Sequence, residues 1–141
     1  MLMLSDFRRS LYLRGIDGLG SDFPETLERI RTLIPAPSEG RVVTLGTSAG
    51  GLAAIWAAIE LGLPRAVSVG GVTPDEIGER VQTQGMSSPG FDDAIRRSAG
   101  RLPEVLLVSG EQNARDNRKA LSMAGRLPAT LISVPDCAHH N

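Results

Sequence analysis

The stretch that decides the fold is Arg41-Val-Val-Thr-Leu-Gly-Thr-Ser-Ala-Gly-Gly-Leu-Ala-Ala-Ile-Trp-Ala-Ala-Ile-Glu-Leu-Gly62. Its first residues, Arg41 to Leu45, favour a strand, and Leu52 to Leu61 is apolar on nearly every face, as in a buried helix. Between them, Gly46-Thr-Ser-Ala-Gly50 fits the pattern G-x-S-x-G. A strand that turns sharply into a helix needs small neighbours, because the helix start passes close to the strand. We therefore expect the Ser48 hydroxyl to stand above a sheet, at the positive end of a helix.

Length and composition indicate one domain covering residues 1–141. With 22% charged residues and a formal net charge of -1, the chain has no basic face that would indicate nucleic acid binding. The longest apolar run, residues 52–63, is interrupted by Glu60 and is too short to span a bilayer. The chain start lacks the features of a signal peptide, and the single cysteine, Cys137, excludes an internal disulfide. These features predict a cytoplasmic protein without a membrane span.

Strands and helices are expected to alternate along the chain. Beside the strand at residues 41–45, we expect strands at residues 10–14, 66–71, 105–110 and 130–134. Helices are expected from Asp22 onward, after Ser48, and near residues 74–81, 88–99 and 115–124. This alternation predicts an α/β fold with a mainly parallel sheet of about five strands and flanking helices.

Residues that could activate Ser48 follow two of the expected strands. Asp116 comes after the strand at residues 105–110, and the only histidines, His139 and His140, come after the last strand. The carboxyl ends of parallel strands meet at one edge of a sheet, so these residues should approach Ser48. A serine hydroxyl needs a base to take its proton and a third group to hold that base. The chain order Ser48, Asp116, His140 is the order expected for a nucleophile-elbow hydrolase.

The sequence resembles the α/β-hydrolase superfamily over almost its whole length. The resemblance is carried by Gly46-Thr-Ser-Ala-Gly50, Gly15-Ile-Asp-Gly-Leu-Gly-Ser21, Val105-Leu-Leu-Val-Ser-Gly110 and Ala138-His-His140. It implies Ser48 as the nucleophile, the backbone N–H of Ala49 as one oxyanion donor, and a histidine base near the C-terminus. His140 is preferred as the base, with His139 as the alternate. The family acid usually follows the last glycine of its strand by three residues, and Asn113 occupies that position here.

A further departure from the family concerns the start of the chain. The family has a strand ahead of Ser10 whose following loop donates a second oxyanion N–H, and nine residues are too few for that strand and its crossover helix. A missing donor would lower turnover by about two to three orders of magnitude if nothing replaced it. The same absence leaves one sheet edge open, and a homodimer through that edge is a further expectation.

Two functions are compatible with these features. The first is a serine hydrolase that cleaves a small-molecule carboxylic ester or thioester through an acyl-enzyme on Ser48, without a cofactor or metal. The alternative is a catalytically weak or inert α/β-hydrolase-like domain with a binding or assembly role. A weaker third hypothesis is a phosphate-binding module at the helix start after Gly46. Residues 73–91 occupy the place of a short lid in this family.

Overall fold

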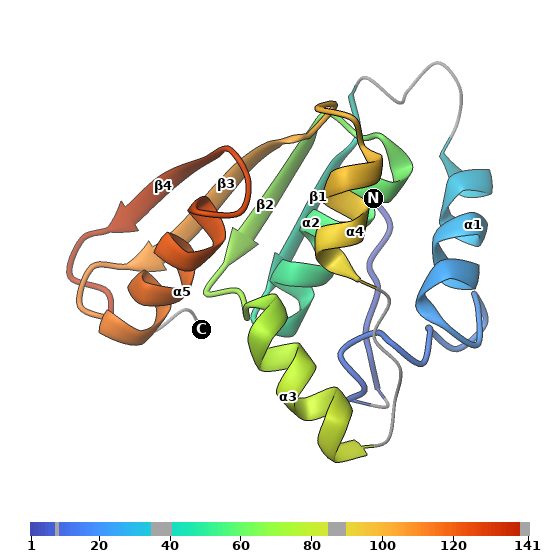
Figure 1. Ribbon diagram of the computed structural model, residues 1–141, viewed down its shortest axis with the longest axis horizontal. Helices are drawn as coiled ribbons and strands as arrows, with labels where there is room; N and C mark the ends of the chain where they lie inside the picture. Colours follow the sequence, from blue (N-terminus) through green and yellow to red (C-terminus); the bar gives the residue numbers. More distant parts are fainter. Residues whose placement is uncertain (8, 35–40, 85–89, 139–141) are drawn as a thin grey trace.

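The computed structural model describes residues 1–7, 9–34, 41–84 and 90–138. Its centre is a four-stranded parallel sheet in the order β1-β2-β3-β4 (Figure 1). The strands are β1 (Val43–Thr47), β2 (Arg65–Val69), β3 (Glu104–Gly110) and β4 (Ala129–Val134). The helices of the described residues are α1 (Phe23–Leu33), α2 (Ala49–Leu61), α3 (Pro74–Gln84), α4 (Phe91–Arg97) and α5 (Ala114–Ala124). The predicted α/β fold with a parallel sheet is confirmed.

The prediction of a fifth strand at residues 10–14 is wrong. These residues form turns, in which Leu11 and Tyr12 have φ angles of 59° and 66°. Such angles lie in the left-handed region, which strands do not use. The Asp6 carboxylate holds the turns, because it accepts hydrogen bonds from the Tyr12 N–H at 2.9 Å and the Ser10 hydroxyl at 3.3 Å. The apolar alternation of Leu11 and Leu13 reflects two side chains that the turns bury in the core.

The helix ends follow local sequence signals. The Asp22 side chain caps α1 by accepting a hydrogen bond from the Glu25 N–H at 2.8 Å, and Pro24 occupies its first turn. Helix α2 is apolar around most of its circumference and is largely buried. It ends at Gly62, whose φ of 65° is the left-handed conformation that suits glycine. None of the described helices is both long and apolar enough to cross a membrane.

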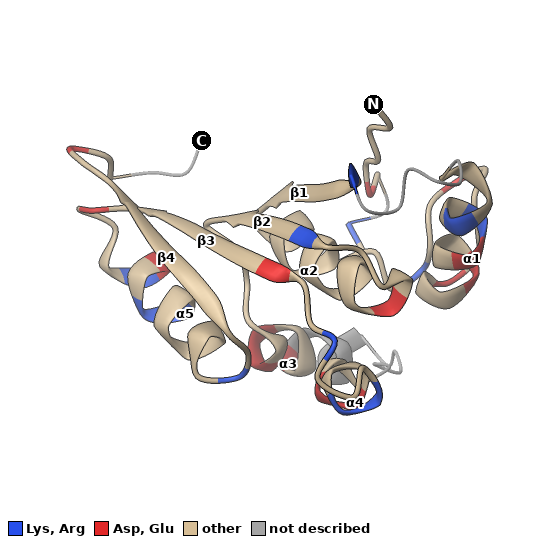
Figure 2. Cartoon of the chain, turned by 90° about the horizontal axis from the view of Figure 1, so that it is seen from above, with Lys and Arg blue, Asp and Glu red and all other residues tan. Residues whose placement is uncertain are grey.

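The helices cover one face of the sheet. Figure 2 shows α2, α3, α4 and α5 on the same side, with α1 beside α2. This follows from the strand order, because neighbouring strands joined by right-handed crossovers place every crossover helix on the same face. On that face Ala66 and Val105 are at most 1% exposed, whereas Val43 and Leu45 on the opposite face are 47% and 68% exposed.

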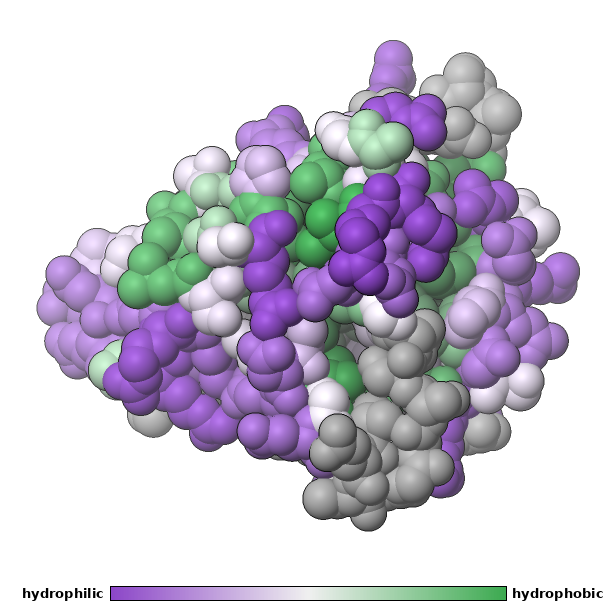
Figure 3. All heavy atoms as spheres, viewed as in Figure 1, coloured by the Kyte–Doolittle hydropathy of each residue, from purple (hydrophilic) through white to green (hydrophobic). Residues whose placement is uncertain are grey.

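An aromatic cluster joins the helices at the core. Trp56 of α2 is 4% exposed, and its ring centroid lies 4.9 Å from that of Phe23 and 5.8 Å from that of Phe91. The cluster therefore connects α1, α2 and α4. Figure 3 shows hydrophilic residues over the outer surfaces of α4 and α5 and hydrophobic residues along β3 and β4 between them.

Candidate functional site

Ser48 is the single residue between β1 and α2, and its backbone is strained. It has φ 52° and ψ -122°, an unusual conformation for a residue with a side chain. Its N–H donates to the Val69 carbonyl at 3.0 Å. Its own carbonyl accepts hydrogen bonds from the Gly51 N–H at 3.0 Å and the Val72 N–H at 3.2 Å. The strand, the helix and the loop after β2 therefore all hold this turn in place.

The glycines around Ser48 have no room for side chains. A Cβ atom on Gly46 would overlap the Gly50 carbonyl and lie 2.8 Å from the Gly51 nitrogen. A Cβ atom on Gly51 would overlap the hydroxyl of Ser68, which is buried on the neighbouring strand. These clashes involve backbone and buried atoms, so the first turn of α2 can approach the sheet this closely only with glycine at these positions.

The start of α2 can stabilise negative charge. Ser48 is exposed, and its side chain makes no capping hydrogen bond to the helix. The first turn of α2 contains no acidic residue, so no carboxylate offsets the positive end of the helix dipole there. An anion that forms beside the Ser48 hydroxyl would lie close to the N–H groups at the start of α2, including that of Ala49.

Tyr12 lies beside this helix start, and the sequence did not indicate it. A Cβ atom on Gly50 would lie 3.3 Å from the Tyr12 hydroxyl, so the tyrosine ring packs against the first turn of α2. Burial and then the negative charge of Asp6 raise the pKa of the Tyr12 phenol, which keeps it protonated. The pattern of residues 10–14 suggested a strand, which is why sequence reasoning missed a turn that carries a phenol to the site.

Asp116, the predicted triad acid, is buried and paired within α5. It is 3% exposed, and its Oδ2 accepts a hydrogen bond from Asn113 Nδ2 at 2.8 Å. Its Oδ1 lies 3.6 Å from Lys119 Nζ. Asn113 caps α5, because its Oδ1 accepts a hydrogen bond from the Asp116 N–H at 3.0 Å. The structure therefore brings Asp116 and Asn113 together, and the role of either as triad acid stays a prediction.

The predicted bases, His139 and His140, lie outside the described residues. The described part of their loop packs against the loop that follows β3. The Gln112 N–H donates to the Cys137 carbonyl at 3.0 Å, and the Glu111 N–H donates to the Val134 carbonyl at 2.9 Å. Since the four strands are parallel, this pair of loops lies at the same sheet edge as Ser48.

Glu111 is a carboxylate at this edge that the sequence analysis did not single out. It is exposed, and its Oε2 accepts a hydrogen bond from the Asp136 N–H at 3.4 Å. Glu111 therefore reaches the loop that leads to the histidines. The signal that could have found it is its position directly after Gly110, at the end of β3.

An ion-pair network joins the helix after β2 to the helix after β3. The Glu76 carboxylate of α3 accepts hydrogen bonds from the Thr73 N–H at 3.0 Å and from Arg115 Nη2 at 3.2 Å, and it lies 3.5 Å from Lys119 Nζ. Burial acts to raise the pKa of Glu76, but the Thr73 hydrogen bond and the two cations outweigh burial and lower the pKa.

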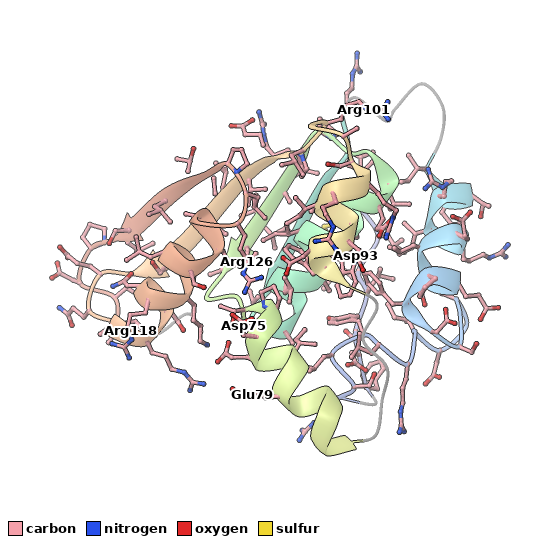
Figure 4. All side chains as sticks on the ribbon, in the orientation of Figure 1. Asp75, Glu79, Asp93, Arg101, Arg118 and Arg126 are labelled. Carbon is pink, nitrogen blue, oxygen red and sulfur yellow. The ribbon has the colours of Figure 1, made fainter. Side chains whose placement is uncertain are left out.

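A cavity of about 330 Å³ lies between α2, α3 and α4. Its lining includes Trp56 and Phe91 as well as Asp75 and Asp92, and Ser48 is not among its described lining residues. Arg126 pairs with Asp75 at 2.7 Å and with Asp92 at 2.9 Å, and Figure 4 shows Arg126 and Asp75 side by side. Within the described ranges, no group of three or more histidine, cysteine or acidic side chains could hold a metal ion.

Comparisons with known proteins support the fold. No protein family model and no curated protein matches the sequence. Among solved structures, the chain is similar to the capsule O-acetyltransferase of Neisseria meningitidis serogroup A, with a TM-score of 0.62 and 13% sequence identity. The match covers 83% of this chain and 56% of that chain. At this identity the likeness shows the fold alone.

Proposed function

We propose that the chain is an acyl-transferring enzyme, a serine hydrolase that cleaves a carboxylic ester or thioester through an acyl-enzyme on Ser48. The observation that carries the proposal is the strained, exposed Ser48 at the start of α2, with φ 52° and ψ -122°. Holding a residue with a side chain in such a conformation costs about 1–3 kcal/mol. Glycine would occupy it without that cost, so the retained hydroxyl points to a chemical role rather than a packing role.

In this reaction the Ser48 Oγ attacks the substrate carbonyl carbon while a histidine takes the hydroxyl proton. The carbonyl oxygen becomes an oxyanion, which the Ala49 N–H and the positive end of α2 stabilise. Collapse of the tetrahedral intermediate breaks the bond to the alcohol or thiol, which leaves with the proton from the histidine. Water then attacks the acyl-enzyme by the same steps in reverse order and regenerates the serine.

We assign the base to His140, with His139 as the alternate. Support comes from the loop after β4, which packs against residues 110–112 at the sheet edge where Ser48 stands. Asp116 remains the proposed acid, although its carboxylate already has partners in Asn113 and Lys119. Glu111 is the competing assignment, because it reaches the loop that carries the histidines.

Transfer of the acyl group to a hydroxyl acceptor is a second candidate function. It is favoured by the likeness to a capsule O-acetyltransferase, whose name describes the transfer of an acetyl group to an oxygen. Hydrolysis and transfer share the acyl-enzyme and differ only in whether water or an alcohol attacks it. The exposed position of Ser48 leaves room for either acceptor.

Hydrolysis of p-nitrophenyl acetate and of an acetyl thioester tests the proposal. Ser48→Ala should abolish turnover, and Ser122→Ala, an exposed serine on α5, should retain it. Glu111→Gln and Asp116→Asn should lower kcat by different factors, and the variant with the larger loss identifies the triad acid. If an alcohol can accept the acyl group, added glycerol should raise the rate of p-nitrophenol release and should yield acetylglycerol. Equal background rates for the wild type and Ser48→Ala would instead favour the inert binding domain.

A further inference from the structure

One face of the parallel sheet has no helix against it in the described chain. Figure 2 shows the crossover helices on the opposite side. Parallel sheets occur almost only with both faces covered, because their strands carry apolar side chains in both directions. The side chains of Met1, Met3 and Phe7 are 114%, 80% and 85% exposed, so these three are not packed against the face. The uncovered face is therefore available to a partner, and its pattern of side chains bears on the chemistry of that partner.

The middle of the face is mostly apolar, with one threonine at the end of each row. The strand register places Leu45, Val67, Leu106 and Thr130 in one row across the four strands. The next row runs in the same way from Thr47 of β1 to Ile132 of β4, through two valines. Leu45 is 68% exposed and Ile132 is 39% exposed, whereas side chains of the two central strands on this face are only partly exposed.

The charged residues of these strands form one pair at the amino end of the face. Arg65 of β2 and Glu104 of β3 are register partners, and Arg65 Nη2 lies 2.6 Å from Glu104 Oε2. Both side chains remain about half exposed, at 50% and 53%. The two opposite charges therefore sit on either side of the line that separates β2 from β3, which is the midline of the four-stranded sheet.

We propose that this face binds the same face of a second copy, related by a two-fold axis that runs parallel to the strands between β2 and β3. Such an axis places β2 of one copy over β3 of the other, so Arg65 of each copy meets Glu104 of the other. It also places Val67 of each copy over Leu106 of the other. Two stacked sheets keep their strands nearly aligned, so this contact needs no change in either sheet. The interface is isologous, as in most homodimers.

Charge complementarity selects a second copy over an unrelated partner. A self-pairing face must present both charges at positions that the two-fold axis exchanges, and Arg65 and Glu104 meet this requirement. Four strands of five to seven residues form a face of about 15 by 20 Å, or roughly 300 Å² per copy, which is smaller than the roughly 800 Å² per partner of a standard stable interface. We therefore expect a weak dimer, with a dissociation constant on the order of tens of micromolar. The axis leaves Ser48 at the outer strand of each copy, with both serines at the same end of the dimer.

Sedimentation equilibrium of the full chain between about 5 and 200 μM tests this interface. The wild type should form a dimer, and Leu106→Glu should be monomeric across the range. Arg65→Glu and Glu104→Arg should each raise the dissociation constant at least tenfold, because like charges then face each other across the axis. An equimolar mixture of these two variants should form a heterodimer, since every glutamate again meets an arginine.

Far-UV circular dichroism and melting temperature establish that each variant is folded. The double variant Arg65→Glu with Glu104→Arg, which keeps the pair within the chain, should dimerise like the wild type. A monomeric wild type at 200 μM would overturn the proposal. A dimer that is insensitive to Leu106→Glu and to both single reversals would also overturn it and would point to the β1 edge instead. So would a mixture of the two single variants that stays monomeric.

Discussion

Replacement of Ser48 by glycine should stabilise the protein while it removes the reactive hydroxyl. The φ of 52° and ψ of -122° are costly for any residue with a Cβ atom and are accessible to glycine. The strain is worth about 1–3 kcal/mol, and the greater freedom of glycine in the unfolded chain offsets about 0.5–1 kcal/mol of it. The free energy of unfolding of Ser48→Gly should therefore exceed that of Ser48→Ala by about 1 kcal/mol.

Urea unfolding followed by circular dichroism measures this difference. Both variants lack the hydroxyl, so their comparison isolates the backbone, and for a domain of this size about 1 kcal/mol corresponds to roughly 3–4 °C in melting temperature. Ala53→Gly, inside α2, is the matched control and should lower the free energy of unfolding by about 1 kcal/mol. The reasoning is refuted if Ser48→Gly is no more stable than Ser48→Ala, because the turn would then store no strain.

Three further changes test the surroundings of the site. Gly46→Ala should lower the free energy of unfolding by about 3 kcal/mol, measured by urea unfolding, because its methyl group would overlap backbone atoms of Gly50; a wild-type midpoint would show that the helix start can move. Trp56→Ala should cost about 3–5 kcal/mol by the same assay, through the loss of its contacts with Phe23 and Phe91, and a cost below 1 kcal/mol would contradict the packing. Glu76 has a folded pKa below its ordinary value of 4.5, so its stabilising contribution is complete well above pH 4.5 and is lost as the pH falls through the folded pKa. As the pH falls through the folded pKa of Glu76, the difference in the free energy of unfolding between the wild type and Glu76→Gln should shrink. A difference independent of pH would refute a stabilising role of the Glu76 charge.

Local signals in the sequence predicted most of the elements. Asp22 and Pro24 marked the start of α1, and the apolar run after Ser48 marked a buried helix, because caps and continuous apolar surface act over a few residues. The prediction of a strand at residues 10–14 was wrong because a contact from outside this segment sets its conformation. The Asp6 carboxylate stabilises turns there, and no local pattern distinguishes such a turn from a strand that buries Leu11.

The candidate site was less predictable than the fold. The turn at Ser48 depends on adjacent residues, so its position between β1 and α2 could be predicted from glycine spacing. The surroundings of Asp116 depend on which side chains α5 brings into contact. The spacing of Asn113 and Asp116 is also that of a helix cap, and the structure shows them bonded to each other at the start of α5. Glu111 and Tyr12 reach the sheet edge through loop contacts that strand and helix patterns do not encode.

Covalent labelling at Ser48 tests the central claim most directly. The wild type is incubated with a fluorophosphonate, digested, and analysed by mass spectrometry for the site and stoichiometry of the adduct. We predict one adduct per chain, on Ser48, that is absent from Ser48→Ala. The adduct should form more slowly in His140→Ala, which lacks the proposed base. A folded wild type that stays unlabelled, or an adduct on any other residue, would contradict an acyl-enzyme on Ser48.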